Sequence, residues 1–137
     1  MKLRVKDSVR EILETCHTIA VVGLSARPDR PGHYVPAYMQ AQGYRIIPVN
    51  PNLEQALGER AYPSLDEVPE TVDLVLLFQR SENVPPFVEQ AIHIGAKAVW
   101  MQTGIKNAAA AAQATAAGLS VVMDACIMVE HRRWQAE

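Results

Sequence analysis

Five short runs of apolar, largely β-branched residues recur along this chain, and segments typical of helices and turns separate them. The runs cover residues 17–23, 44–50, 73–78, 97–102 and 119–123. Strands that are apolar at nearly every position are typical of a parallel sheet covered on both faces. Strands that alternate with helices through short loops favour right-handed βαβ crossovers. The sequence therefore predicts an α/β fold, a Rossmann-like doubly wound and mostly parallel five-stranded sheet flanked by helices.

The segments between these runs carry helix signals. Ser8 and Glu11 have the spacing of a capping box, which predicts a helix from Ser8 to about Cys16. A second helix is expected from about His33 to Gln42, with Gly43 as its C-terminal cap. Pro36 should lie in its first turn because proline disrupts a helix interior. Further helices are expected at 83–95 and 107–117, with one helical turn near 64–67 and a terminal helix turn or strap at 130–134.

Size and composition favour one domain over residues 1–137, because 137 residues with 49% hydrophobic and 20% charged side chains suit a single core. A net charge of -2 gives no overall attraction to nucleic acid or to a membrane surface. Two cysteines are too few for a disulfide framework, and the first residues lack the apolar region of a signal peptide. We therefore expect a cytoplasmic protein with no nucleic-acid or membrane partner.

The loop after the first run, residues 23–32, is the strongest candidate for a ligand site. In open parallel sheets, ligands bind beyond the carboxyl ends of the strands, near the point where the strand order reverses. Gly23 allows close approach of the backbone, Ser25 offers a hydroxyl, and Arg27 and Arg30 offer positive charge. Because the loop leads into a helix N-terminus, it predicts a phosphate site. The alternative is an ordinary solvated turn.

Two observations argue against a nicotinamide dinucleotide. The loop has neither the G-x-G-x-x-G fingerprint nor the lysine of a P-loop. The second strand ends in Asn50, where a site for NAD usually has an acidic residue for the ribose. An NAD(P)-binding domain stays an alternative on fold analogy alone.

The other strand ends supply binding groups rather than a catalytic set. Residues 78–81 and 101–105 contribute amide side chains, one guanidinium and exposed backbone. No nucleophile and base stand at a recognisable spacing, and no Cys or His pattern resembles a zinc site, so the sequence leans away from an enzyme and predicts no metal. Cys126 falls on the ligand-binding edge, as either a small buried residue or a reactive thiol.

Taken together, several segments resemble the small CoA-binding protein family, which is similar to the CoA-binding domain of the succinyl-CoA synthetase α subunit. The resemblance covers essentially the whole chain. It is carried by residues 19–25 with Pro28, Arg30 and Pro31, and by residues 43–44, 48–51, 62–65, 99–102 with Gly104, and 126–130. The chain ends where a synthetase would continue into the domain that bears its phosphorylated histidine.

The resemblance implies coenzyme A or an acyl-CoA as the cofactor, with its diphosphate on the loop after the first strand. The residues implied to bind it are Gly23, Leu24, Ser25, Arg27, Arg30, Val49, Asn50, Phe78, Gln79, Arg80, Gln102 and Thr103. Asn50 would face the ribose or adenine, Gln79 and Arg80 the middle of the cofactor, and Gln102 and Thr103 the pantetheine. Arg45 and Arg80 are both candidates for the 3′-phosphate because arginine suits phosphate geometry.

The leading functional hypothesis is a stand-alone CoA or acyl-CoA binding protein, non-catalytic or regulatory. One alternative is a CoA-dependent enzyme or thiol-exchange protein that uses Cys126, and another is the NAD(P)-binding domain. A regulatory subunit whose affinity for a partner protein depends on CoA is a further hypothesis, and the sequence leaves room for a homodimer.

Overall fold

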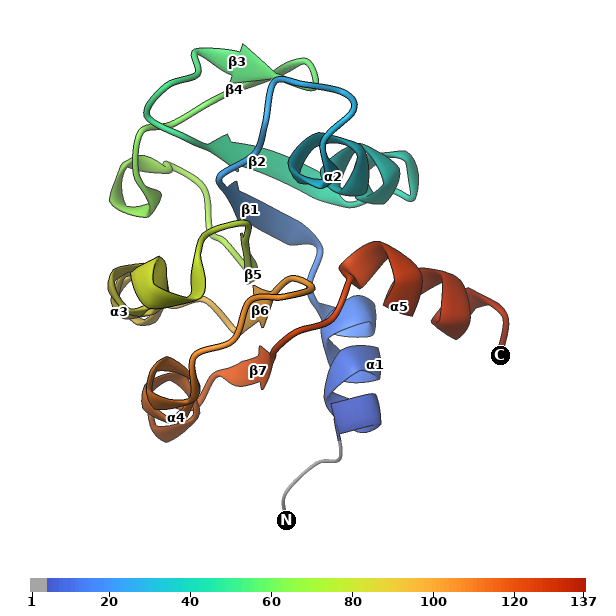
Figure 1. Ribbon diagram of the computed structural model, residues 1–137, viewed down its shortest axis with the longest axis vertical. Helices are drawn as coiled ribbons and strands as arrows, with labels where there is room; N and C mark the ends of the chain where they lie inside the picture. The colour runs from blue at the N-terminus through green and yellow to red at the C-terminus, as the bar shows by residue number, and fades with distance from the viewer. Residues whose placement is uncertain (1–4) are drawn as a thin grey trace.

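The central sheet consists of five parallel strands in the order β2-β1-β5-β6-β7 (Figure 1). The computed structural model describes residues 5–137. In chain order the strands of this sheet are β1 (Thr18–Val22), β2 (Arg45–Val49), β5 (Leu74–Leu77), β6 (Ala98–Met101) and β7 (Ser120–Val122). Each neighbouring pair runs parallel. The predicted α/β architecture, with its five-stranded parallel sheet, is therefore confirmed.

Helices cover both faces of the sheet (Figure 1). One face carries α1 (Val5–Thr15), α2 (Pro31–Ala41) and α5 (Ile127–Gln135), and the other carries α3 (Val84–His93) and α4 (Ala108–Ala116). Successive strand residues point to opposite faces, so Ile19 and Val21 pack with the first group of helices, while Ala20 and Val22 pack with the second. None of the helices within residues 5–137 is long and apolar enough to cross a membrane.

The strand order reverses between β1 and β5. The chain passes from β1 to β2 on one side, and then returns across β1 to place β5 on the other side. The loops that follow β1 and β5 therefore lead away in opposite directions. In folds of this kind, the space between two such loops is where ligands bind.

Two helix starts differ from the sequence-based expectation. Helix α1 begins at Val5, so Ser8 lies inside the helix and the predicted capping box at Ser8 is wrong. Helix α2 begins at Pro31, because proline is favoured at the first helical position. Pro36 is therefore in the second turn rather than the first, and its missing N–H leaves the Gly32 carbonyl without its helical donor. The Ser25 N–H donates to that carbonyl instead, over 3.0 Å.

A short hairpin between β2 and β5 was not predicted. It consists of β3 (Gln55–Ala56) and β4 (Glu59–Arg60), and its turn places Leu57 and Gly58 at φ values of +55° and +74°. Turns of this kind are usually signalled by Asn-Gly or Asp-Gly, and leucine is rare at positive φ. The predicted helical turn near Ser64 is confirmed as a 3₁₀ turn at Leu65–Glu67, and a second 3₁₀ turn, Ser81–Asn83, precedes α3.

An aromatic cluster around His131 joins α5 to the rest of its face of the sheet. The predicted terminal turn is a nine-residue helix, and His131 within it is only 3% exposed. The Tyr38 hydroxyl of α2 lies 2.8 Å from His131 Nδ1, and the rings of Tyr44 and Trp134 meet the imidazole edge to face. The Tyr44 hydroxyl in turn donates to the Leu13 carbonyl of α1. Burial lowers the pKa of His131.

This burial predicts a loss of stability in mild acid. An unfolded histidine takes up a proton near pH 6.5, whereas His131 in the folded protein takes it up only at lower pH. Below about pH 6.5 the unfolded state binds more protons, so the free energy of unfolding falls, by at most about 1.4 kcal/mol per pH unit. Urea unfolding between pH 8 and 5 should show this fall, and His131→Gln should reduce it.

His93→Gln is the matched control, because His93 is exposed on α3. That variant should keep the pH dependence of the wild type. If His131→Gln and the wild type lose stability in parallel as the pH falls, His131 is not the responsible group.

Candidate functional site

A cleft of about 970 Å³ lies over the carboxyl ends of β1, β5 and β6, with the first turns of α2 and α5 in its lining. The structure brings together nine of the twelve predicted cofactor-binding residues there, namely Gly23, Ser25, Arg27, Arg30, Phe78, Gln79, Arg80, Gln102 and Thr103. Residues that were not among the twelve predicted cofactor-binding residues complete the lining, among them Tyr34, Ile105, Met128 and Val129. The reversal of strand order therefore coincides with a cleft large enough for a ligand.

Gly23 lines the cleft at the start of the loop after β1, next to the start of the loop after β5. Its φ is +86°, and a Cβ atom at this position would stand 2.4 Å from the Phe78 carbonyl oxygen and 2.9 Å from Gln79 Nε2. A side chain here would therefore be strained in its backbone and would also separate the two loops. Glycine is required at this position by the positive φ and by the close contact with Phe78.

Ser25 fixes the shape of the loop after β1 through three hydrogen bonds. Its N–H donates to Gly32, its carbonyl lies 2.7 Å from His33 Nδ1, and its hydroxyl accepts from the Arg27 N–H over 3.1 Å. Because that hydroxyl still has its own hydrogen to donate, Ser25 can hold the loop and contact a ligand oxygen at the same time.

The side chains that line the cleft carry positive charge only. The lining includes Arg27, Arg30 and Arg80 but no aspartate, glutamate or histidine. Arg27 has a loose contact with exposed Asp29, over 3.4 Å. Two helices also begin at the cleft, and the first-turn N–H groups of a helix attract anions. This combination suits a ligand with more than one phosphate.

Gln102 contributes to the cleft and also supports α5. It is 4% exposed, and its Oε1 accepts the N–H of Ile127, the first residue of α5, over 2.8 Å. Gln102 was predicted to bind the ligand, but its contact with Ile127 was not predicted because the start of α5 was not. Thr103, the next residue, is exposed at the cleft.

The remaining three predicted residues lie elsewhere. Val49 and Asn50 line a neighbouring pocket of about 480 Å³ that shares Gly23, Phe78 and Gln79 with the cleft. The Asn50 side chain links two loops, because its Nδ2 donates to the Leu24 carbonyl and its Oδ1 accepts from the Asn52 N–H. The Leu24 side chain is fully buried in the core, since it packs with the helices on that face, and does not line either pocket.

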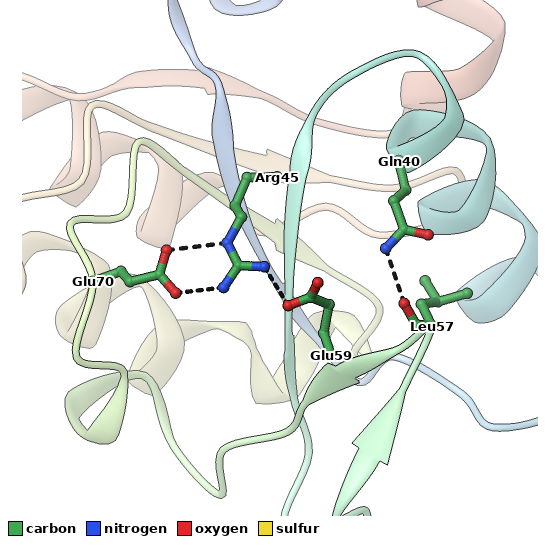
Figure 2. A network of polar contacts seen from close by, with 5 residues as sticks. All are labelled: Gln40, Arg45, Leu57, Glu59 and Glu70. Atoms are coloured by element: carbon green, nitrogen blue, oxygen red, sulfur yellow. Dashed lines mark hydrogen bonds and ion pairs between the residues drawn. The ribbon is translucent and has the colours of Figure 1, made fainter.

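Arg45, one of the two candidates for the 3′-phosphate, is not at the site. It is the first residue of β2, about 13 Å from the carboxyl end of that strand at the usual rise per residue. Figure 2 shows its guanidinium held between Glu70 and Glu59. The same view shows Gln40 of α2 donating to the Leu57 carbonyl at the hairpin turn. Arg45 therefore has a structural role in fastening the hairpin, and Arg80 remains as the candidate in the cleft.

Cys126 also lines the cleft, at the residue that precedes α5. It is half-buried, whereas Cys16 is buried in the core beside α1. Within the described part of the chain, no group of three or more His, Cys, Asp or Glu side chains is arranged to hold a metal ion.

Comparison with known proteins gives the family of this chain. Residues 17–132 match the model of a protein family described as CoA binding domain. The chain is 44% identical over 126 residues to uncharacterized protein YneT from Bacillus subtilis, a match that covers 92% of this chain and 93% of YneT. It is also similar to the structure of a hypothetical protein from Pyrococcus horikoshii, with a TM-score of 0.90, 41% identity, and coverage of 96% and 92% of the two chains.

A more distant relative is a much longer protein. The ADP-forming acetate–CoA ligase II of Archaeoglobus fulgidus is 30% identical over 93 residues. The match covers 66% of this chain but 14% of the ligase. The relatives therefore include both chains of similar length and a small part of a larger enzyme.

The contact between Gly23 and Phe78 predicts a large effect of a single methyl group. Gly23→Ala should lower the free energy of unfolding by about 2 kcal/mol or more, from backbone strain together with the clash. Gly118→Ala is the matched control, because Gly118 has a φ of +92° but a Cβ atom added there would have no neighbour within 4 Å. Urea unfolding gives the free energy of unfolding of both variants, and the difference between their losses measures the cost of the clash. Equal losses would show that the close approach does not constrain the fold.

Proposed function

The chain belongs to the family of CoA-binding domains, and we propose that it binds coenzyme A or an acyl-CoA in the cleft over β1, β5 and β6. The observation that carries this proposal is the gathering of three arginines and two helix N-termini around one cleft that has no acidic side chain in its lining. Coenzyme A carries a diphosphate and a 3′-phosphate, and arginine suits both. Its pantetheine arm suits the less charged part of the same cleft.

The family resemblance implies a direction for the ligand along the row of strands. The diphosphate would lie on the loop after β1, against Ser25, Arg27 and Arg30. From there the adenosine would extend over the end of β2 into the pocket lined by Val49 and Asn50, and the pantetheine would extend past β5 toward Gln102 and Thr103 at the end of β6. Neighbouring strands are about 4.8 Å apart, so these positions follow one another along the edge of the sheet.

We further propose that the protein acts by binding rather than by catalysis. The cleft lining has no histidine or carboxylate that could serve as a general base for Ser25 or Thr103. A ligand-controlled interaction with another protein is the function that such a site can provide by itself. Copurification of protein partners with and without saturating CoA would test this part of the proposal.

The central test is ligand binding. Saturating CoA should raise the melting temperature by several degrees, because a ligand that binds only the folded state stabilises it, by about 2.7 kcal/mol at a hundred times Kd. NAD, NADP and ATP tested in parallel should give smaller shifts. A larger shift with a nicotinamide nucleotide, or none with CoA, would contradict the proposal.

Calorimetry of two variants locates the site. Arg30→Ala and Arg80→Ala should each weaken CoA binding about tenfold, as expected for loss of one charge-assisted contact to phosphate. Arg133→Ala is the control, because Arg133 is exposed in the last turn of α5, 3.0 Å from Glu130, and does not line the cleft. It should leave the CoA affinity unchanged.

A second candidate function is thiol exchange, which is favoured by the presence of Cys126 in the lining of the same cleft. In this reaction the Cys126 thiolate attacks one sulfur of CoA disulfide, a Cys126–CoA disulfide forms, and the other CoA leaves as a thiolate. Intact-mass spectrometry after incubation with CoA disulfide should then show one added CoA, removable by dithiothreitol.

Cys126→Ser should abolish the adduct. Cys16 provides an internal control, because it is 1% exposed and burial raises the pKa of its thiol, so it should stay unmodified. Absence of any adduct on the wild type would reject thiol exchange while leaving CoA binding untouched.

A further inference from the structure

The first turn of α5 presents hydrogen-bond donors that have no acceptor. The N–H groups at the start of any helix lack partners inside that helix. Here the residue before the helix, Cys126, supplies no side-chain cap, and Gln102 Oε1 takes only the N–H of Ile127. The N–H groups of Met128 and Val129 have no acceptor among the described residues. Both residues line the cleft.

Gln102 adds a buried donor beside this helix start. The bond from the Ile127 N–H identifies Oε1 as the acceptor, and therefore fixes the orientation of the amide group. Its Nε2 has no hydrogen-bond partner in the described part of the chain, although only 4% of the residue is exposed. Nε2 itself is not fully buried. Among the described residues, the fully buried side-chain polar atom that lacks a hydrogen-bond partner is Gln90 Oε1, and Gln102 Nε2 does not belong to that class. Because Gln102 lines the cleft, we infer that Nε2 faces it.

An unpaired buried donor is costly, so a ligand oxygen that accepts from it is favoured. The donors here are an amide and peptide N–H groups, which are uncharged. The other side chains that line the cleft near Gln102 and the start of α5 are uncharged and mostly apolar, namely Thr103, Ile105, Cys126, Met128 and Val129. The chemistry that fits is an uncharged carbonyl oxygen attached to a short aliphatic group, because a buried carboxylate would need a cation as its partner.

We propose that Gln102 Nε2, with the first-turn N–H groups of α5, binds the thioester carbonyl of an acyl-CoA. The protein would then prefer short-chain acyl-CoA thioesters to compounds that lack this carbonyl. This inference rests on the proposed function, because the direction of the bound ligand brings the sulfur end of CoA to the ends of β6 and β7. Gln102 follows β6, and α5 follows β7.

The test compares acetyl-CoA with the ethyl thioether of CoA, which has nearly the same shape and the same phosphates but no carbonyl beside the sulfur. Calorimetry on the wild-type protein should show acetyl-CoA binding at least about threefold more tightly, as expected for one added hydrogen bond. Free CoA should bind about as weakly as the thioether. Equal affinity for acetyl-CoA and the thioether would overturn the inference.

Gln102→Glu isolates the donor. The glutamate keeps an oxygen for the Ile127 N–H, so α5 retains its support, but it replaces Nε2 with a second acceptor. The ratio of the two affinities should fall to one or below. Because both ligands carry the same phosphates, the new negative charge weakens both and cancels in this ratio. Gln79→Glu places the same charge change at the end of the neighbouring strand, and should preserve the preference for acetyl-CoA.

The outcomes distinguish this inference from the proposed function. If all three CoA compounds bind the wild-type protein equally well, the thioester assignment is wrong while CoA binding stands. If none of the three binds, the proposed function fails and the inference fails with it. The wild-type comparison needs no variant, so it decides the question even if Gln102→Glu does not fold.

Discussion

The cleft depends on the close approach of two backbones, Gly23 after β1 and Phe78 after β5. Their strands are neighbours in the middle of the sheet, but the chain leaves them in opposite directions. A cleft forms between the two departing loops only if the loops start close together, and this requires a residue without a side chain at position 23. The helix that follows each loop then covers a different face of the sheet.

Most of the fold could be predicted because burial on both faces leaves a strong signal in the sequence. Each of the five strands is a run of apolar residues, and each was found within a residue or two of its observed bounds. The start of α1 and the hairpin were missed for physical reasons. Serine is a residue type favoured at helix N-caps, but Ser8 lies inside α1 and not at its start. Leu57 adopts a positive φ that leucine seldom has.

The candidate site was predictable to the extent that it consists of strand ends. Topology alone brings Gly23, Gln79 and Gln102 to one edge of the sheet, and the structure places all three in the lining of the cleft. Partners distant in sequence were not predictable. Nothing near Arg45 in the sequence shows that Glu59 and Glu70 hold it at the opposite edge, and nothing near Gln102 shows that it supports the first residue of α5.

Pro36 affects how far the loop after β1 is ordered before any ligand binds. By releasing the Gly32 carbonyl, it provides an acceptor for Ser25, so the loop after β1 is bonded to the helix that follows it. The conformational entropy of the loop is therefore lost when the chain folds, and not when the ligand arrives. A preorganised loop of this kind lets more of the interaction energy appear as affinity. Pro36 removes a hydrogen bond from its own helix, and the carbonyl that it frees holds the neighbouring loop in a fixed conformation.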